Sequence, residues 1–474
     1  MFVNNSSPKL VHIAQLCLSV RIRFGYGVGH VLNDLCSAMW FTYLLIYFHH
    51  VLLFNNTLSG LVLLIGQVSK LECYFCYTFF VNVISSSDRT DDLAFCTRYG
   101  RRKTWHLLGT FCVVIAFPFI FLGCFGCFYA DDWAQVIYYT PFVIIFQFGW
   151  ASTQISHLAL IPTITQDPND RTELNAIRKD GWAHGDGRLV PRQRADYWPS
   201  PVSIVSLSTT EACRASLYGF TVVSNITVYV VTWMVLGLST STPETGLQPD
   251  DAIKFRYIVL IVLSIGVVFT IIFHTLVKED NTPQYNKLSP DTDGDKANDP
   301  DDSQFYQVAL LYMATRLFCN LSQAYVPIYI QDSLHLPQES VAYIPLVMYV
   351  AGFLTTMCMK SLNKYIGRKA SFLIGCIIGE AACIAVWFGS GDLYKDYLLY
   401  GVASLLGAGG SILLVTSLSF TADLIGPNVE SGAFVYGAMS FTDKLSNGVA
   451  VMLIQNLNPL LYTGNRINKT LNIN

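Results

Sequence analysis

The sequence predicts an all-α membrane protein built from two pseudo-repeated six-helix bundles. Of its 474 residues, 52% are hydrophobic and only 13% are charged, whereas a soluble domain carries about 25% charged residues. About eleven segments are apolar over roughly 20 residues, the length needed to cross a bilayer. Two similar basic turns, Tyr99–His106 around Gly100 and Lys364–Lys369 around Gly367, occur at corresponding places in the two halves. This repetition is typical of a duplicated bundle.

The predicted spans follow one another as apolar runs separated by loops. In the first half they are Phe24–Leu53, Leu58–Ile84, Trp105–Phe128, Trp133–Ile161, Tyr218–Leu238 and Ile253–Val277. In the second half they are Phe305–Ile330, Val341–Met359, Ala370–Phe388, Tyr397–Phe420 and Gly432–Leu453. The tail 457–474 contains no further apolar run of this length, so we expect a twelfth span to be missing from this sequence.

The charges of the loops predict the orientation in the membrane. The basic loops contain Arg89, Arg98, Arg101, Arg102 and Lys103 in the first half and Lys360, Lys364, Arg368 and Lys369 in the second. The loops at the opposite ends of the spans contain Lys395 as their one basic residue. Because basic loops remain in the cytoplasm, the N-terminal tail 1–23 is predicted to be cytoplasmic. Asn55 and Asn468, each in an Asn-x-Thr pattern, then lie outside the cytoplasm and are predicted glycan acceptors.

Two polar stretches interrupt the apolar pattern. Residues 278–304, rich in Asp, Asn and Pro, predict a cytoplasmic linker between an N-terminal bundle (24–277) and a C-terminal bundle (305–456). Residues 179–217, rich in Gly, Pro and Arg, separate Arg178 from Tyr218 within what would otherwise be one continuous span. They are either a regulatory cytoplasmic loop or an aberrant insertion such as a retained intron, and the second interpretation is favoured.

Polar residues inside the first-half spans are candidate site residues. A charge at bilayer depth costs at least ~2.5 kcal/mol, so it should face a partner or an aqueous cavity. Asn33 and Asp34 place an amide and a carboxylate inside the first span. We expect them to contact substrate or a proton; the alternative is a helix-packing carboxylate satisfied by a neighbouring hydroxyl. Gln147 and Gln154 lie two turns apart on one face of the fourth span, where they either line a pore or bond to another helix.

The second half contains two further polar groups. Arg316, Asn320 and Gln323 share one face of the seventh span at i, i+4 and i+7. A guanidinium in this position suits recognition of a carboxylate, and an Arg–Asp lock between the two bundles is the alternative. Asp443 and Lys444, in the eleventh span, predict a substrate or gating pair. Because adjacent helical residues point about 100° apart, each is expected to need its own partner.

These features favour a carrier that works by alternating access. The two bundles are expected to rock about a polar site at mid-membrane, with the basic turns as cytoplasmic latches. The residues predicted to have this gating role are Arg89, Gly100, Arg101, Arg102, Gly367, Arg368 and Asp443. The expected partners are a small-molecule substrate, a coupling cation (a proton or sodium) and the lipid bilayer.

Other functional classes find little support in the sequence. There is no Gly-x-Ser-x-Gly, His-Glu-x-x-His or phosphate-loop pattern, so we expect no enzyme and no cofactor. The net charge of −3 and the absence of a basic helix argue against a nucleic-acid partner. The CxxC pairs Cys73/Cys76 and Cys124/Cys127 lie in apolar runs without paired histidines. We therefore expect buried reduced thiols and no metal site.

Several motifs carry a resemblance to a known family. They are Gly27–Asp34, Asp88–Thr90, Arg98–His106, Asp170–Arg178, Tyr312–Gln323, Ser431–Gly437 and Ser440–Gly448. In this order they resemble the major facilitator superfamily, in its glycoside–pentoside–hexuronide:cation symporter-like branch. The resemblance implies a twelve-helix fold, residence in lysosomes and melanosomes, and import of cysteine into these organelles.

The resemblance also implies a set of site residues. Asp34 and Arg178 match positions that contact substrate in related bacterial symporters, and Lys444 matches an eleventh-span lysine. Gln154 stands where the sugar carriers have a carboxylate, and Ser69–Ser86 departs from the family pattern, which argues against a cation site in the second span. The predicted substrate-binding residues are Asn33, Asp34, Gln154, Arg178, Arg316, Asn320 and Lys444. The alternatives are a sugar:cation symporter and, from another class, a non-transporting membrane scaffold or a non-functional splice product.

Overall fold

The structure, a computed structural model, describes residues 20–70, 99–124, 126, 130–160, 220, 222–237, 246–279, 302–425 and 439–457. Within these ranges the chain is helical and contains no strand, which confirms the all-α prediction. Arg89, Arg178, Asn468 and the stretch 179–217 lie outside the described residues, as does most of the linker 278–304. The predictions made for them therefore remain predictions.

The helices of the N-terminal bundle coincide with its apolar runs. The first rod comprises α2 (Val20–Val28), α3 (Val31–Ala38) and α4 (Leu44–Ile46), with π-helical turns at η1 (Met39–Tyr43) and η2 (Tyr47–Val51). A helix over 56–70 follows, then α7 (Arg101–Ile120), α8 (Asp132–Ala159), the helix Val222–Gly237, the short η3 (Pro249–Asp251) and α12 (Ala252–Leu276). Each predicted span of this half overlaps one of these helices.

The third predicted span ends earlier than expected. Its apolar run predicts a helix to Phe128, but α7 ends at Ile120, so this boundary is wrong. Tyr139 of α8 donates a hydrogen bond to the carbonyl of Leu122 at 2.8 Å and so holds the chain just beyond the helix end. Phe121, the residue that follows the helix, is also apolar and fully buried. The hydrophobic composition therefore does not indicate that α7 ends at Ile120.

The C-terminal bundle repeats the same organisation. It contains α13 (Asp302–Asp332), α14 (Ser340–Ile366), α15 (Arg368–Phe388), the π-helical η5 (Tyr394–Leu398), α16 (Leu399–Ile425) and a helix over 439–457. Gly367 precedes α15 with φ 81°, and Gly100 precedes α7 with φ 103°. Both positions lie in the left-handed region that favours glycine. The two basic turns predicted from the sequence therefore have the same backbone role in each half.

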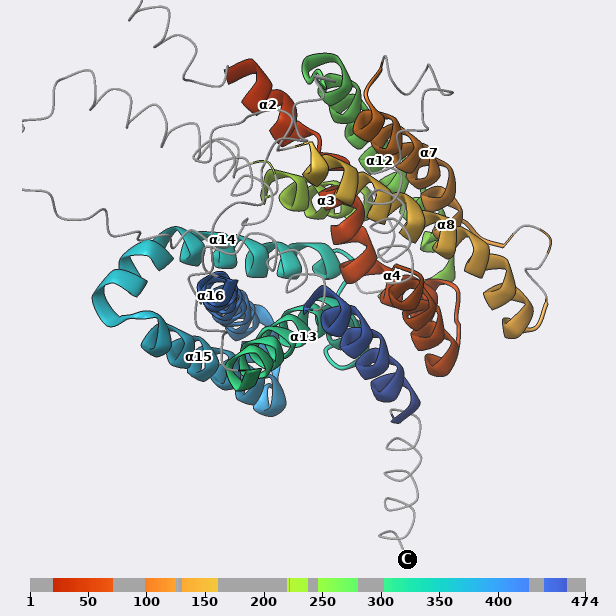
Figure 1. Ribbon diagram of the computed structural model, residues 1–474. Helices are drawn as coiled ribbons and strands as arrows, with labels where there is room; N and C mark the ends of the chain where they lie inside the picture. Colours follow the sequence, from red (N-terminus) through yellow and green to blue (C-terminus); the bar gives the residue numbers. More distant parts are fainter. Residues whose placement is uncertain are drawn as a thin grey trace, which may run out of the picture.

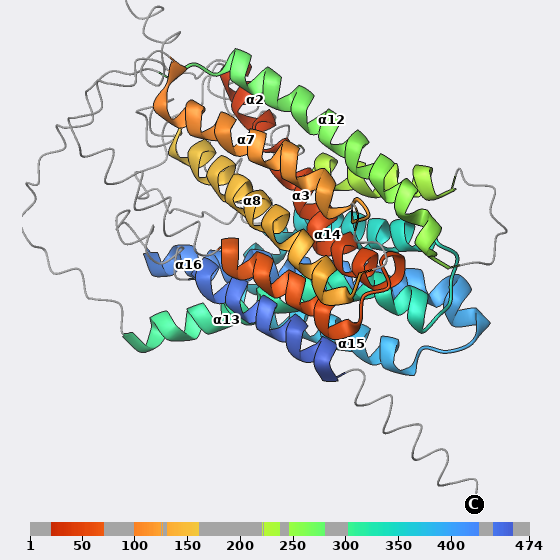
Figure 2. The ribbon, with the colours of Figure 1, turned by 90° about the vertical axis from the view of Figure 1, so that its right-hand side faces the viewer.

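Figure 1 shows the two groups of helices side by side, with α2, α3, α4, α7, α8 and α12 in one group and α13 to α16 in the other. The helix 56–70 lies along the helix 439–457, as Figure 2 also shows. A Cβ added at Gly448 would approach the end of the Leu64 side chain to 2.8 Å, so the two helices are closely packed at this crossing. The first rod packs against α13 near η1. These crossings form the interface between the bundles.

One contact marks each of the two ends of the helical bundles, and each end is named below after a residue that lies there. His50, at the end of the first rod, lies beside Asp332, at the end of α13, and this end is the His49 end. Arg102, at the start of α7, contacts Glu279, just after α12, and that end is the Gly100 end. Both the first rod and α13 therefore run from the Gly100 end to the His49 end.

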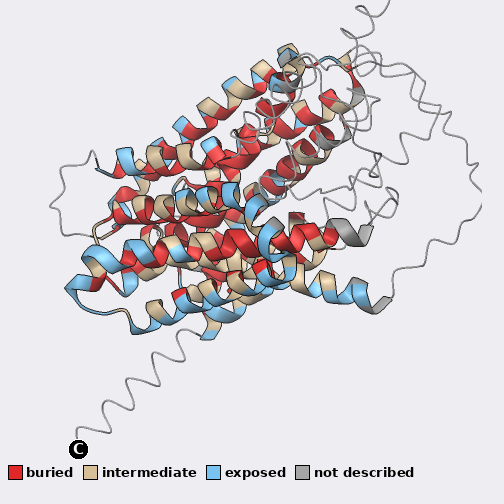
Figure 3. Ribbon diagram, turned by 90° about the vertical axis from the view of Figure 1, so that its left-hand side faces the viewer, coloured by how far each residue is buried: buried red, intermediate tan, exposed pale blue. Residues whose placement is uncertain are grey.

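The outward faces of the helices are apolar, as expected for contact with lipid. Figure 3 shows exposed residues along the outer sides of the bundles, and on α15 they include Leu373, Ile377, Trp387 and Phe388. Six described helical segments are long and apolar enough to cross a membrane: Phe24–Val51, Arg102–Ile120, Pro249–Leu276, Ser340–Met359, Arg368–Phe388 and Tyr394–Thr421. An integral, multi-pass membrane protein accounts for both observations.

Candidate functional site

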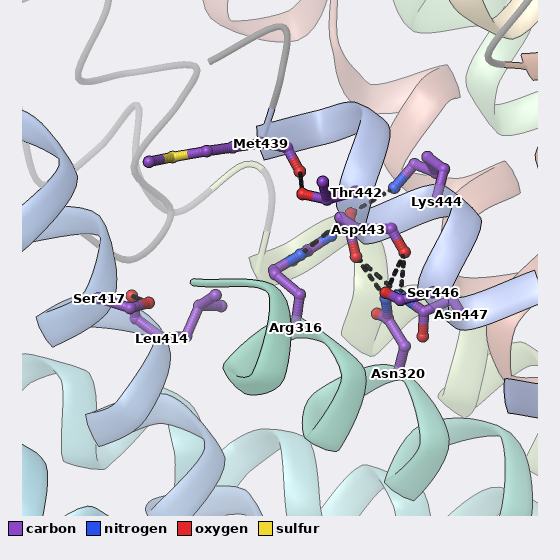
Figure 4. Close-up of polar contacts among 10 residues, drawn as sticks. All are labelled: Arg316, Asn320, Leu414, Ser417, Met439, Thr442, Asp443, Lys444, Ser446 and Asn447. Carbon is purple, nitrogen blue, oxygen red and sulfur yellow. Dashed lines mark hydrogen bonds and ion pairs between the residues drawn. The ribbon is translucent and has the colours of Figure 1, made fainter. Parts of the chain in front are cut away.

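Asp443 lies at the centre of a buried polar cluster in the C-terminal bundle (Figure 4). Lys444 Nζ donates to Asp443 Oδ2 at 2.7 Å, and Arg316 Nε lies 3.5 Å from the same oxygen. Asn447 Nδ2 donates to Asp443 Oδ1 at 2.7 Å, and Asn320 Nδ2 donates to it at 3.3 Å. The side chain of Asp443 is only 2% exposed, so its charge depends on these partners.

Among the described residues, the cluster has an excess of positive charge. Arg316 and Lys444 share the single carboxylate of Asp443. The Arg316 side chain is 26% exposed, and its Nε makes no hydrogen bond. A partly exposed guanidinium beside a neutralised carboxylate suits the binding of a carboxylate from a solute. This agrees with the substrate role predicted for Arg316, which stays a prediction.

Two details of the sequence interpretation are wrong. Asp443 and Lys444 do not need separate partners, because the long lysine side chain folds back onto the neighbouring carboxylate. The Arg–Asp pair considered as a lock between the bundles joins Arg316 of α13 to Asp443 of the helix 439–457, and both belong to the C-terminal bundle. It therefore fixes helices within one half.

A buried lysine of the N-terminal bundle, Lys70, belongs to the same region. Its Nζ lies 3.0 Å from the ring centroid of Trp150 on α8, a cation–π contact. Trp150 in turn packs edge-on against Phe41, with centroids 6.2 Å apart, and Lys444 Nζ lies 5.9 Å from the Phe41 ring. Aromatic rings thus connect cations of the two bundles. Lys70 is missing from the site residues predicted from the sequence, although a lysine within an apolar segment is itself a signal.

Asn33 and Asp34 are buried in α3 but have different partners. Thr153 of α8 donates to Asn33 Oδ1 at 2.7 Å. Asp34 Oδ1 lies 2.9 Å from His30 Nδ1, one turn earlier on the same rod, while its Oδ2 is buried without a hydrogen-bond partner. The i, i+4 spacing of His30 and Asp34 could have been found in the sequence. The unpartnered carboxylate oxygen can accept a bond from a cation or an ammonium group.

Asp34 and Arg316 lie at about the same depth between the two ends. Gln323 of α13 donates to Thr42 of the first rod at 3.0 Å and to Tyr229 at 3.2 Å, which fixes the register of the two rods. Asp34 precedes Thr42 by eight residues, about 12 Å along the rod, and Arg316 precedes Gln323 by seven residues, about 10.5 Å. Both rods run in the same direction, so Asp34 and Arg316 lie at about the same level between the two ends.

The two glutamines of α8 differ in their surroundings. Gln147 is fully buried, and both atoms of its amide lack a hydrogen-bond partner. Gln154 is half-buried next to Thr153, which bonds Asn33. A buried amide without a partner costs stability, so Gln147 suits either a polar solute or water at this level of the bundle.

The basic turn at Gly100 is held within the N-terminal bundle. Glu279 accepts hydrogen bonds from the backbone N–H groups of Arg102 at 3.1 Å and Lys103 at 3.2 Å, and it pairs with the Arg102 guanidinium at 3.4 Å. Lys103 Nζ donates to the carbonyl of Val277 at 2.7 Å. A carboxylate thus caps the start of α7 and an ammonium the end of α12, as helix dipoles favour. The side chain of Arg101 lies outside the described residues. The gating roles of this turn, Gly367 and Arg368 stay predictions.

Two further predictions concern the His49 end. Asn55 is exposed, and its Oδ1 accepts the backbone N–H of Leu58 at 2.9 Å, so it caps the helix 56–70. Its Nδ2, the atom that a glycan would modify, is not needed for this cap.

Cys124 is disulfide-bonded, so the expectation of a reduced thiol is wrong at this position.

Family comparisons cover most of the chain. A family model described as MFS/sugar transport protein matches residues 25–185, and one described as Major Facilitator Superfamily matches residues 196–451. Major facilitator superfamily domain-containing protein 12 of Homo sapiens is 42% identical over 467 residues, which cover 93% of this chain and 86% of the human protein. The protein of that name from Mus musculus is 41% identical over 463 residues, covering 93% and 86%. An uncharacterized symporter of Synechocystis is 22% identical over 488 residues, covering 91% and 84%.

Solved structures share the fold. The nucleoside transporter NupG matches with a TM-score of 0.54 at 10% sequence identity, covering 92% of this chain and 91% of that one. The inward open conformation of the xylose transporter XylE from E. coli matches with a TM-score of 0.54 at 12% identity, covering 92% and 88%. At such low identity these likenesses establish the arrangement of helices and say nothing about the substrate.

Proposed function

Because this chain belongs to the major facilitator superfamily and is therefore a multi-pass secondary transporter, we propose that it moves a small zwitterionic solute, cysteine, across the membrane of a lysosome or melanosome. Cysteine and the organelle come from the family resemblance carried by the motifs of the sequence. The identity of 41–42% to the two mammalian proteins supports applying that resemblance to this chain.

The charge of the Asp443 cluster is the observation that supports a zwitterionic solute as the substrate. Arg316 and Lys444 together exceed the single negative charge of Asp443, and Lys70 adds a basic group nearby. A cluster with this excess needs an anionic group, and the carboxylate of an amino acid supplies one. Asp34, with one buried unpartnered oxygen at the same depth, is the group we propose for the substrate ammonium.

A sugar is the second candidate. One matching family model is described as MFS/sugar transport protein, and Gln147 with its unpartnered amide is the kind of group that bonds a hydroxyl. A neutral sugar, however, offers no charge to balance Arg316 and Lys444. The charge excess therefore favours the zwitterion.

Alternating access is the mechanism we propose. Contacts between the bundles at the His49 end hold the structure closed there: Gln331 accepts the backbone N–H of Leu247 at 2.8 Å, and Gln338 donates to the carbonyl of Leu236 at 3.2 Å. Lys254 also donates to Gln338 at 3.1 Å. These bonds must break when this end opens, while the Glu279 contacts at the Gly100 end stay within one bundle. Rocking about the central level then exposes the site to each side in turn.

Uptake into proteoliposomes tests this proposal. The purified full-length chain should accumulate labelled cysteine, and excess unlabelled cysteine should compete while xylose and other sugars should not. Asp34→Asn should lower uptake efficiency at least about thirtyfold, since removing one partner of a buried charge pair costs ~2 kcal/mol or more. Asp392→Asn is the matched control, because Asp392 is exposed at the start of the helical segment that follows α15.

Two results would contradict the proposal. Saturable uptake of a sugar without uptake of cysteine would establish the second candidate instead. Cysteine uptake by Asp34→Asn equal to that by Asp392→Asn would remove Asp34 from the site, while leaving the substrate class in place.

A further inference from the structure

Three metal-ligating side chains meet between the bundles at the His49 end. His49 and His50 lie in η2 at the end of the first rod, and Asp332 ends α13. His50 Nε2 is 2.9 Å from Asp332 Oδ1, and His49 Nε2 is 3.7 Å from Asp332 Oδ2. One nitrogen or oxygen from each of the three residues lies within 4.8 Å of the others. Neither the proposed substrate site nor the basic turns include this group.

The backbone of η2 explains how adjacent histidines reach the same carboxylate. On an α-helix neighbouring side chains point about 100° apart, but the π-helical turn Tyr47–Val51 changes the rotation between residues. The imidazole rings of His49 and His50 are almost perpendicular, at 89°, with centroids 4.9 Å apart. Both rings therefore present Nε2 to Asp332. Widened turns of this kind are frequent at functional sites.

The spacing is close to that of a coordination shell. Tetrahedral ligands with bonds of about 2.0–2.1 Å lie roughly 3.3 Å from one another. The nitrogens of His50 and His49 lie 2.9 Å and 3.7 Å from different oxygens of Asp332, and one ligand atom from each residue lies within 4.8 Å of the others. Small side-chain rotations would bring all three to ligand distance. His50 Nε2 is buried and lies 2.9 Å from Asp332 Oδ1. A neutral imidazole nitrogen is a metal ligand, and a metal bound here would replace the direct contact between the ring and the carboxylate.

The types of side chain also suit a cation, since two imidazoles and one carboxylate meet here. Neutral imidazoles and a carboxylate form the mixed ligand set that zinc accepts, with room for water at an open position.

We propose that His49, His50 and Asp332 bind a divalent transition metal such as Zn²⁺, and that the bound metal holds the His49 end closed. The ligands come from both bundles, so the full site exists only while the two rods remain together. Metal at 100 times its dissociation constant then shifts the population toward the closed state about 100-fold. This second part rests on the proposed alternating access, whereas the binding site itself does not.

Binding of Zn²⁺ alone to the purified full-length chain tests the site. Titration calorimetry should give one zinc per chain, and His49→Gln, His50→Gln and Asp332→Asn should each weaken binding at least about tenfold. His335→Gln is the matched control, because His335 lies three residues beyond Asp332 and its ring contacts the carbonyl of Gln331 at 3.0 Å. His50→Cys, which keeps a ligand at this position, should retain binding that His50→Gln loses. This rescue separates the loss of a ligand from a general loss of structure.

Several results would overturn the site. Equal affinity for zinc in the unmodified chain and all three cluster variants would exclude it, as would an equal loss in His335→Gln. Failure of His50→Cys to bind, with a monodisperse gel-filtration profile, would show that position 50 is no ligand.

The effect on transport is measured separately. Zinc added on the side of the His49 end should inhibit uptake by the unmodified chain and by His335→Gln, but not by His50→Gln. Inhibition that persists in His50→Gln would overturn the closing effect. If the chain transports no solute tested, the proposed function fails, and the calorimetry still decides whether the metal site exists.

Discussion

Removal of the negative charge at Asp443 is the perturbation that most directly tests the central cluster. In Asp443→Asn the side chain keeps its shape, but one carboxylate oxygen becomes an amide that donates hydrogen bonds. That donor faces Lys444 and Arg316, which can only donate. Asn447 and Asn320 can still bond the remaining oxygen. The substitution therefore leaves Arg316 and Lys444 without the carboxylate that both contact in the described part of the chain.

The magnitude follows from burial. Breaking a buried ion pair by removing one partner costs about 3–5 kcal/mol. Asp443 is 2% exposed and Lys444 10%, but Arg316 is 26% exposed and can recover some hydration. We therefore expect the lower limit, about 3 kcal/mol, which is roughly a 150-fold rise in the unfolded-to-folded ratio.

Equilibrium unfolding in mixed detergent micelles, followed by circular dichroism, measures this loss. Asp392→Asn makes the same chemical change at an exposed position and should change the unfolding curve little. The double variant Asp443→Asn/Lys444→Met should recover about 1–2 kcal/mol of the loss, since it removes one of the orphaned cations. Unfolding of Asp443→Asn within error of Asp392→Asn, or strict additivity in the double variant, would refute the role of Asp443 as the carboxylate that compensates both cations.

Two other predictions address packing and orientation. Gly407→Ala on α16 should destabilise the chain by about 1–3 kcal/mol or block folding, because its Cβ would overlap the backbone carbonyl oxygen of Met348 on α14. Gly401→Ala, on the same helix with nothing within 4 Å of its Cβ, should be tolerated, and equal melting temperatures of the two variants would contradict the prediction. Asn55→Gln and Thr57→Ala should each reduce the endoglycosidase-sensitive gel shift by one glycan, because each destroys the acceptor pattern at Asn55 and leaves that at Asn468; a shift equal to that of the unmodified chain would contradict the predicted external position of Asn55.

The helices could be predicted because lipid imposes a simple rule on the sequence. Every backbone polar group in a bilayer must bond internally, so an apolar run of sufficient length becomes a helix. Each predicted span accordingly overlaps a helix of the described structure. The same rule carries no information on where a buried helix stops. The end of α7 at Ile120 depends on a hydrogen bond from Tyr139 to Leu122, a tertiary contact that composition does not encode.

The central site could be predicted in part. The i, i+4 spacing placed Arg316 and Asn320 on one face, and the structure brings both to Asp443. The partner of each charge was beyond prediction, because it depends on which helices are neighbours. An Arg–Asp ion pair between the bundles and one within a single bundle both appear in the sequence as an arginine and an aspartate inside two apolar spans. Similarly, the meeting of His50 with Asp332 requires the register of the first rod on α13.

The aromatic contact of Lys70 suggests how substrate binding and bundle movement are connected. Trp150 stabilises the ammonium of Lys70 through its ring face, without neutralising the charge. Lys444, on the other bundle, lies 5.9 Å from the ring of Phe41, and Phe41 packs against Trp150. Like charges on two sides of an interface repel, and an anion between them is attracted to both. Lys444 also contacts Asp443, which offsets part of this repulsion. If the substrate carries a carboxylate, as proposed above, its binding at this level would draw the two bundles together and its departure would let them separate. A neutral analogue that fits the same space would then be expected to bind without promoting closure.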